Sequence, residues 1–172
     1  MINYVKGDAT LPKVEGAKII VHCCNDVGAW GRGFVLALSK RWPFAEEAYR
    51  TWFAGWKSEA GPPKEWEGRV DVTGPLQLGE VQLVIVGPRL LVANLIGQHG
   101  IEMWPDNRPP IRYDAIQHGL QKVYRYTQIH SASVHMPRMG SGLAGGRWDA
   151  VEKLVDKELA LKGVSVTVYD LP

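Results

Sequence analysis

The chain has 172 residues, a length that supports one well-buried core but is short for two domains. Hydrophobic residues make up 45% and charged residues 22%, as in ordinary globular proteins. The net charge is +2 and there is no basic run, which excludes a large nonspecific nucleic-acid footprint. A single anionic ligand in one pocket is still compatible with this charge. No apolar stretch reaches the length of a membrane span and the N-terminus lacks a signal-peptide pattern, so we expect a cytoplasmic protein without membrane contacts.

Strand-like and helix-like segments interleave along the chain. In chain order the pattern predicts strands over 2–5 and 17–24, helices over 33–41 and 44–55, strands over 78–86 and 90–95, a helix over 112–129, a strand over 132–136, a helix over 148–161 and a strand over 164–169. The runs at 17–24 and 132–136 are apolar instead of alternating, which is typical of strands covered on both faces. An α/β fold with a central sheet between helices is therefore predicted. Segments 56–74 and 104–110 are predicted to be surface excursions.

The two cysteines, Cys23 and Cys24, are adjacent on a predicted strand. Their side chains should point to opposite faces, so a disulfide between them would be strained. They also lack the two-residue spacing of zinc and redox motifs. We interpret them as reduced residues that line the core, and we expect no metal site.

Four glycines fall within the seven residues 140–146, between a predicted strand and a predicted helix. Such a segment turns tightly and points several backbone N–H groups at one place, and at a helix N-terminus these donors can cradle a phosphate. A structural turn is the alternative interpretation.

A second glycine-bearing junction follows the strand at 17–24, over residues 25–34. Ligands of α/β sheets bind beyond the carboxyl ends of the strands. We therefore expect one anionic ligand to be held from two sides by these loops, the alternative being two unrelated turns.

Residues 140–145 formally match GxGxxG, but only one helix and one strand can follow, so a conventional Rossmann dehydrogenase is disfavoured. The absence of GxxxxGK[ST] disfavours a P-loop nucleotide triphosphatase.

Three motifs in order resemble the macrodomain family of ADP-ribose-binding modules and hydrolases: Gly7-Asp8-Ala9-Thr10, His22-Cys23-Cys24-Asn25 and the loop 137–145. The loop 25–33 with its Trp30 most resembles the branch of ADP-ribose 1''-phosphate phosphatases and terminal ADP-ribose glycohydrolases. The resemblance runs from residue 2 to residue 171. It implies one macrodomain over 1–172, with a three-layer α/β/α fold and a mixed, mostly parallel sheet.

The resemblance also implies ligand contacts. Asp8 is expected to accept a hydrogen bond from the adenine amino group, and Asn25 to bind the distal ribose hydroxyls. The ligand-binding residues it implies are Asp8, Ala9, Asn25, Gly31, Arg32, Gly33, Phe34, Gly140, Ser141, Gly142, Leu143, Ala144, Gly145, Tyr169 and Leu171. The residues alone leave alternatives open: Asp8 as a cap, Asn25 as a turn former and Tyr169 as an aromatic buried in the sheet.

Cleavage of an ADP-ribosyl bond needs a positioned water and help for the leaving group. The candidate catalytic residues, all at predicted strand ends, are His22, Asp26, Gln98 and His99. A satisfied core histidine and ordinary polar loop residues are the alternatives. Ala144 stands where terminal glycohydrolases carry an aspartate and many other members an aromatic residue, so mechanisms that depend on those residues do not transfer.

We therefore expect a metal-independent hydrolase of ADP-ribosyl linkages, of the O-linked ester type of mono-ADP-ribosylation, on protein or nucleic acid. The alternatives are a reader of ADP-ribose without turnover and a phosphatase of ADP-ribose 1''-phosphate. No cofactor is expected, the partners are ADP-ribose and the modified macromolecule, and a monomer is expected.

Overall fold

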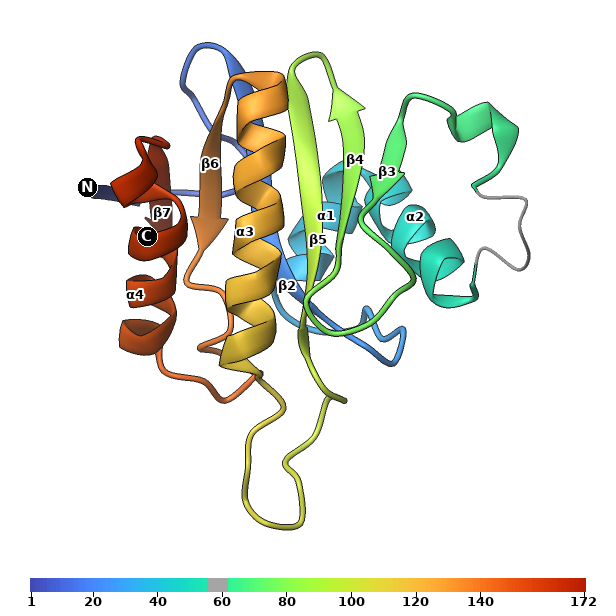
Figure 1. Ribbon diagram of the computed structural model, residues 1–172, viewed down its shortest axis with the longest axis vertical. Coiled ribbons are helices and arrows are strands. Elements are labelled where there is room, and N and C mark those ends of the chain that lie inside the picture. Colours follow the sequence, from blue (N-terminus) through green and yellow to red (C-terminus); the bar gives the residue numbers. More distant parts are fainter. Residues whose placement is uncertain (56–61) are drawn as a thin grey trace.

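The computed structural model describes residues 1–55 and 62–172, and within them the chain folds as a seven-stranded sheet between two layers of helices (Figure 1). In chain order the elements are β1 (Ile2–Lys6), β2 (Ala17–Asn25), α1 (Phe34–Arg41), α2 (Pro43–Phe53), the 3₁₀ helix η1 (Lys64–Trp66), β3 (Val70–Val72), β4 (Val81–Gly87), β5 (Leu90–Gln98), α3 (Tyr113–His130), β6 (Ala132–Pro137), α4 (Trp148–Glu158), the 3₁₀ helix η2 (Ala160–Lys162) and β7 (Val166–Asp170). The predicted three-layer α/β/α fold is confirmed.

The strands lie in the order β1-β7-β6-β2-β5-β4-β3. The first five run parallel to one another, and β4 and β3 are antiparallel to their neighbours. The sheet is therefore mixed and mostly parallel, as predicted. Because parallel strands share a direction, the loops that follow β1, β7, β6, β2 and β5 all leave from one edge of the sheet.

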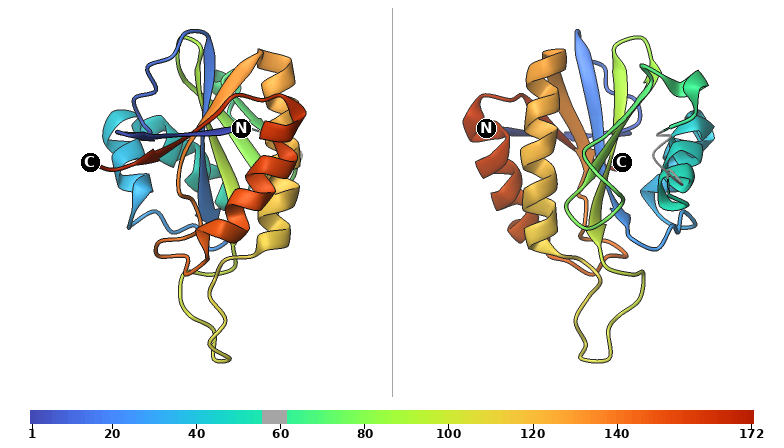
Figure 2. Two further views of the ribbon diagram at one scale, coloured as in Figure 1. Left: turned by 90° about the vertical axis from the view of Figure 1, so that its left-hand side faces the viewer. Right: turned by 45° about the vertical axis from the view of Figure 1, so that its right-hand side comes forward.

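Alternate residues of β2 face the two helical layers. Ile20 and Cys24 belong to the core cluster that includes Leu38 of α1 and Trp52 of α2. Ile19, Val21 and Cys23 face the cluster built with α3 and α4. The two layers on opposite faces are visible in the right-hand view of Figure 2. Both cysteines are free and the adjacent pair faces opposite ways, which confirms the prediction.

The two central strands send their chains to opposite faces. β2 leads into α1 on one face, whereas its neighbour β6 leads into α4 on the other. Such a switch point leaves a crevice beyond the carboxyl ends of the two strands, which is where α/β sheets bind ligands.

Several predicted boundaries were wrong. The segment 56–74 was predicted as a surface excursion: residues 56–61 lie outside the described part, but Trp66 is buried and Val70–Val72 is a strand of the sheet. Three residues are too few for an alternating pattern to reveal a strand. The strand predicted from residue 78 begins at Val81. The helix predicted to end at residue 161 ends at Glu158 and is followed by η2.

In the part of the chain that the structure describes, no helix is both long and apolar enough to cross a membrane.

Candidate functional site

Two adjoining cavities occupy the carboxyl edge of the sheet at the switch point. One, of about 240 Å³, is lined by His22, Cys23, Arg32, Gly33, Phe34, Val35, Gln98, Pro137, Arg138, Met139, Gly140, Gly142, Leu143 and Ala144. The other, of about 400 Å³, is lined by Cys23, Cys24, Asn25, Ala29, Gly31, Arg32, Val35, Gln98, Ile101, Glu102 and Leu143. Because they share Arg32, Gln98 and Leu143, we treat them as one crevice. The predicted convergence of the two glycine loops on one place is confirmed.

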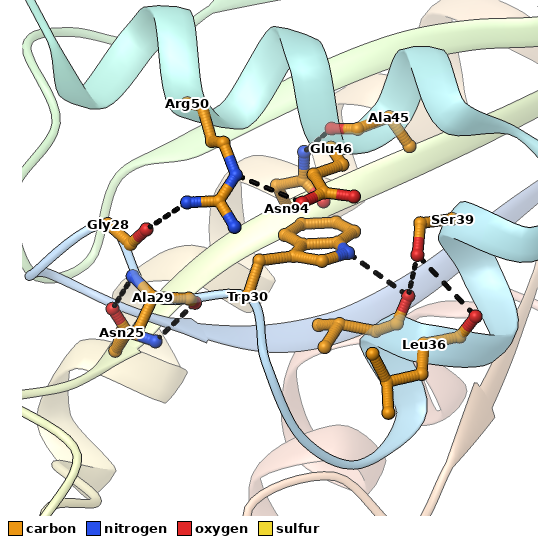
Figure 3. Close-up of polar contacts among 11 residues, drawn as sticks. Asn25, Gly28, Ala29, Trp30, Leu36, Ser39, Ala45, Glu46, Arg50 and Asn94 are labelled. Atoms are coloured by element: carbon orange, nitrogen blue, oxygen red, sulfur yellow. Dashed lines mark hydrogen bonds and ion pairs between the residues drawn. The ribbon is translucent and has the colours of Figure 1, made fainter.

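Asn25 shapes the loop that follows β2 (Figure 3). Its Oδ1 accepts hydrogen bonds from the backbone N–H groups of Val27 and Ala29, at 3.1 and 3.0 Å, and its Nδ2 donates to the Ala29 carbonyl at 2.8 Å. The Tyr49 hydroxyl donates to the Asn25 backbone carbonyl at 2.7 Å. This is the turn-forming arrangement that the sequence left open, although Asn25 also lines the crevice. Its contact with a ribose stays a prediction.

Helix α2 holds the same loop from outside, and the indole of Trp30, which is part of the loop, anchors it to α1 (Figure 3). Nη1 of Arg50 donates to the Gly28 carbonyl at 3.1 Å while its Nε bonds Glu46 at 2.9 Å. Trp30 is 3% exposed, and its Nε1 donates to the Val35 carbonyl at 3.1 Å. The loop is thereby fixed with Gly31 and Arg32 against the crevice.

The glycines of the second loop, 138–147, serve two different needs. Gly140 has φ +77°, and a Cβ there would collide with the Ile111 side chain. A Cβ on Gly146 would collide with the Gly140 carbonyl. These two glycines are required by the fold. Gly142 is different, because a Cβ there would meet no protein atom within 4 Å, so packing does not explain it.

Arg138 fastens the start of this loop to the end of β7. Its Nε and Nη2 donate to the two carboxylate oxygens of Asp170 at 2.5 and 2.8 Å, a bidentate pair that lowers the pKa of Asp170. The Arg138 guanidinium also lies 5.1 Å from the ring centroid of Tyr4 and 5.7 Å from that of Trp148. No local pattern predicts this pair, because its members are distant in the chain.

His22 lies in a buried polar ladder that crosses three strands. Its Nε2 lies 2.5 Å from Oδ1 of Asn94, and Nδ2 of Asn94 donates to Gln82 Oε1 at 3.0 Å. Nδ2 of Asn94 also faces the Ala45 carbonyl at 3.4 Å, which orients the amide so that Nε2 of His22 must carry the proton. Burial lowers the pKa of His22 to about 4, so the ring is neutral near pH 7. The interpretation as a satisfied core histidine is supported, with an amide as its partner.

Asp26 and His99 form a pair. Nδ1 of His99 lies 2.5 Å from Asp26 Oδ2, and the backbone N–H of Gly100 donates to Asp26 Oδ1 at 2.8 Å. Neither residue is among those that line the crevice, whereas Gln98 lines both of its cavities. The pair joins the loop after β2 to the loop after β5.

Glu102, which the sequence analysis missed, lines the crevice together with Gln98. It lies in a loop without any periodic signal.

Asp8 and Tyr169 line a separate cavity beside β1 and β7, of about 380 Å³. Asp8 Oδ1 accepts hydrogen bonds from the Thr10 backbone at 2.8 Å and hydroxyl at 2.7 Å, and its Oδ2 lies 3.4 Å from Arg41. Partial burial acts to raise the pKa of Asp8, but the bonds from Thr10 and Arg41 outweigh it and the pKa is lowered. The Tyr169 hydroxyl bonds Nδ1 of the buried His135 at 2.9 Å.

The remaining predicted ligand residues are placed as follows. Ala9 is buried, Ala144 is buried in the crevice wall, and Leu171 is 80% exposed. The Ser141 hydroxyl donates to the Arg138 carbonyl at 2.7 Å, and the backbone N–H of Gly145 donates to the Gly142 carbonyl at 3.0 Å. Within residues 1–55 and 62–172 no group of three or more His, Cys, Asp or Glu side chains could hold a metal ion.

The sheet order and the crevice at its switch point define the macrodomain class of α/β/α fold, and the chain belongs to the macrodomain family. It is 45% identical to the macrodomain protein from Streptomyces coelicolor, with a TM-score of 0.80 and coverage of 99% of both chains. A protein of unknown function from Bacteroides thetaiotaomicron is 49% identical, with a TM-score of 0.87 and coverage of 99% of this chain and 98% of that one. No protein-family model matches the chain.

Two curated proteins extend the comparison. The mouse chromodomain-helicase-DNA-binding protein 1-like is 32% identical over 182 residues, which cover 99% of this chain but only 18% of that protein. The ADP-ribose 1''-phosphate phosphatase of Saccharomyces cerevisiae is 46% identical over 48 residues, 28% of this chain and 27% of that protein. Relatives therefore include proteins that act on ADP-ribose derivatives.

Proposed function

We propose that this macrodomain binds ADP-ribose in the crevice and hydrolyses an ADP-ribosyl linkage on a modified macromolecule. One observation carries the proposal: two loops from neighbouring strands line the same crevice at the switch point, and Gly142 opens onto space that no protein atom fills. Glycine-rich loops can turn backbone N–H groups toward a diphosphate, and a glycine without a packing role suits close approach of a ligand to the main chain.

The strand order supports one orientation of the ligand. Asp8 and Tyr169 lie at the β1–β7 end of the edge, the two glycine loops lie over β6 and β2, and Gln98 ends β5. With the adenine beside Asp8 and the diphosphate between the glycine loops, the distal ribose reaches the side of β2 and β5, near Asn25 and Gln98.

For hydrolysis, the proposal assigns the water to Gln98 and Glu102. The amide of Gln98 can orient a water at the distal ribose, and the carboxylate of Glu102 can accept a proton from it. His22 is unsuited to this task, because its proton is committed to Asn94 and its pKa of about 4 keeps it neutral. Asp26 and His99 are assigned to holding the loops together.

A reader without turnover is the second candidate. It is favoured because the crevice has few groups that could act as an acid or a base. Within the described residues Glu102 is the single carboxylate of the lining, and Ala144 offers no functional group. A phosphatase is the third candidate, on the strength of the 48-residue likeness to the yeast enzyme.

One set of incubations separates these candidates. Calorimetry with ADP-ribose tests binding, and absence of heat would reject all three. Release of ADP-ribose from mono-ADP-ribosylated protein or DNA, lost in Gln98→Ala, is expected for the hydrolase. Binding without release identifies a reader, and phosphate release from ADP-ribose 1''-phosphate identifies the phosphatase.

Asp8→Asn is expected to reduce selectivity for adenine. The wild type should prefer ADP-ribose to its inosine counterpart, because a carbonyl in place of the amino group would face the Asp8 carboxylate without a hydrogen. Asparagine keeps an acceptor for Thr10 and can donate to the inosine carbonyl, so the ratio of the two dissociation constants should fall about tenfold. Equal losses for both ligands would contradict the placement of adenine.

A further inference from the structure

The loop between β5 and α3, residues 99–112, projects beyond the rest of the molecule at the carboxyl edge (Figures 1 and 2). It is held by its own contacts. The backbone N–H of Trp104 donates to the Arg108 carbonyl at 2.9 Å, and Nε1 of Trp104 donates to the His99 carbonyl at 3.1 Å. The backbone N–H of His99 donates to the Pro110 carbonyl at 2.8 Å. Together with the Asp26–His99 pair, these bonds make the loop a fixed projection.

This fixed loop exposes apolar side chains next to the crevice. Ile101 is 53% exposed and Met103 is 60% exposed, and Ile101 and Glu102 also line the crevice. An apolar surface that is continuous with a ligand cavity indicates a contact site. Under the proposed function, on which this inference rests, the distal ribose ends on this side, so whatever is attached to it leaves past the loop.

The charges of the loop disfavour a nucleic acid as the attached molecule. Its carboxylates are Asp106, which lies 3.4 Å from Arg108, and Glu102, which has no ion pair within the described residues. The cations of the crevice are Arg32 and Arg138, which lie on the glycine loops where the diphosphate is placed, and Arg32 also lines the cavity that contains Glu102. The cations of the loop are already engaged: Arg108 pairs with Asp106, and Arg112 donates to the Pro109 and Ile111 carbonyls at 2.6 and 2.9 Å. Glu102 is the carboxylate of the loop left without an ion pair among the described residues, and a basic segment is complementary to it whereas a phosphodiester is not.

The indole ring of Trp104 in this loop is already in contact with other side chains of the protein. Trp104 stacks on His99 with ring centroids 4.7 Å apart and 20° between the planes. The guanidinium groups of Arg108 and Arg112 lie 5.6 Å from its centroid. Single-stranded nucleic acids are held largely by stacking of bases on available aromatic rings. Trp104 therefore serves to brace the loop.

We infer that the loop 99–112 is the docking surface for the polypeptide that carries the ADP-ribosyl group, with Met103 and Ile101 contacting apolar residues and Glu102 a basic residue near the modified position. Recognition then has two parts: the crevice binds the nucleotide, and this loop binds the protein to which it is attached.

The test compares three ligands: free ADP-ribose, a lysine-containing peptide bearing ADP-ribose through a nonhydrolysable linkage, and a single-stranded oligonucleotide bearing it through the same linkage. The wild type should bind the peptide conjugate about tenfold more tightly than free ADP-ribose. Met103→Ser should remove most of this gain and leave the affinity for free ADP-ribose unchanged. Glu102→Lys should weaken the peptide conjugate and strengthen the oligonucleotide conjugate.

Ile129→Ser is the matched control, because Ile129 is 72% exposed near the far end of α3 and its truncation should change no affinity. Equal wild-type affinities for the peptide conjugate and free ADP-ribose would overturn the inference while leaving the proposed function standing. Tighter binding of the oligonucleotide conjugate would overturn it in favour of a nucleic-acid substrate. Failure of the wild type to bind free ADP-ribose would overturn both proposals.

Discussion

Gly142→Asp is expected to weaken ADP-ribose binding about a hundredfold without destabilising the fold. Two unit charges about 5 Å apart repel by about 3 kcal/mol at the effective dielectric constant of a protein surface, which corresponds to that factor. The fold should tolerate the change, because a Cβ at Gly142 meets no protein atom within 4 Å and the backbone there is outside the left-handed region. Calorimetry gives the affinity and thermal unfolding gives the stability.

Two further variants separate charge from shape. Gly142→Ala adds a methyl group without charge and should weaken binding by a smaller factor. Leu161→Asp places the same charge on η2 at a residue that is 73% exposed, and it should leave the affinity unchanged. An unaltered affinity in Gly142→Asp would mean that the diphosphate does not lie against this loop.

Acidification from pH 6.5 to pH 4 is expected to lower the free energy of unfolding by about 3 kcal/mol for each of two buried histidines. Burial lowers the pKa of His22 to about 4, and burial together with the charge of Lys18 does the same for His135. In this window the unfolded chain takes up protons on these side chains and the folded chain does not, so stability falls as the pH falls. Below pH 4 both states are protonated and this contribution levels off.

Chemical denaturation at a series of pH values measures the effect. His135→Gln should reduce the slope between pH 6.5 and pH 4 by about half, whatever it does to stability at pH 7. Carboxylates act at lower pH: burial acts to raise the pKa of Glu158, yet the bond from Lys162 lowers it to about 2, so its contribution is lost only below about pH 4.5. A free energy of unfolding that is constant between pH 6.5 and pH 5 would contradict the placement of the two histidines.

Local patterns were sufficient to predict the layers and the two loops. The apolar run of β2 predicts burial on both faces, and the adjacent cysteines indicate where the faces divide. Glycine clusters at strand ends predict the crevice, because parallel strands bring their carboxyl ends to one edge. What remained hidden depends on pairing between distant segments. Asn94 opposite His22 and Asp170 beside Arg138 follow from the register of neighbouring strands and from loop geometry, which no local pattern encodes.

The catalytic candidates show the same limit. Gln98, Asp26 and His99 were each predicted to lie at a strand end, but the sequence does not reveal that Asp26 and His99 bond to each other while Gln98 lines the crevice. Glu102 carries no signal in the sequence, because it lies in an irregular loop and only the fold places it in the lining of the crevice.

The ladder of His22, Asn94 and Gln82 fixes the register of the strands that end at the carboxyl edge of the sheet. A slip of β5 by one residue would turn the Asn94 amide to the opposite face and leave the polar groups of its two neighbours buried without partners. Misaligned pairings are thereby penalised, and β2 and β5 are fixed at one offset. The two ends that shape the crevice are consequently kept level with each other by a chain of amides deep inside the molecule.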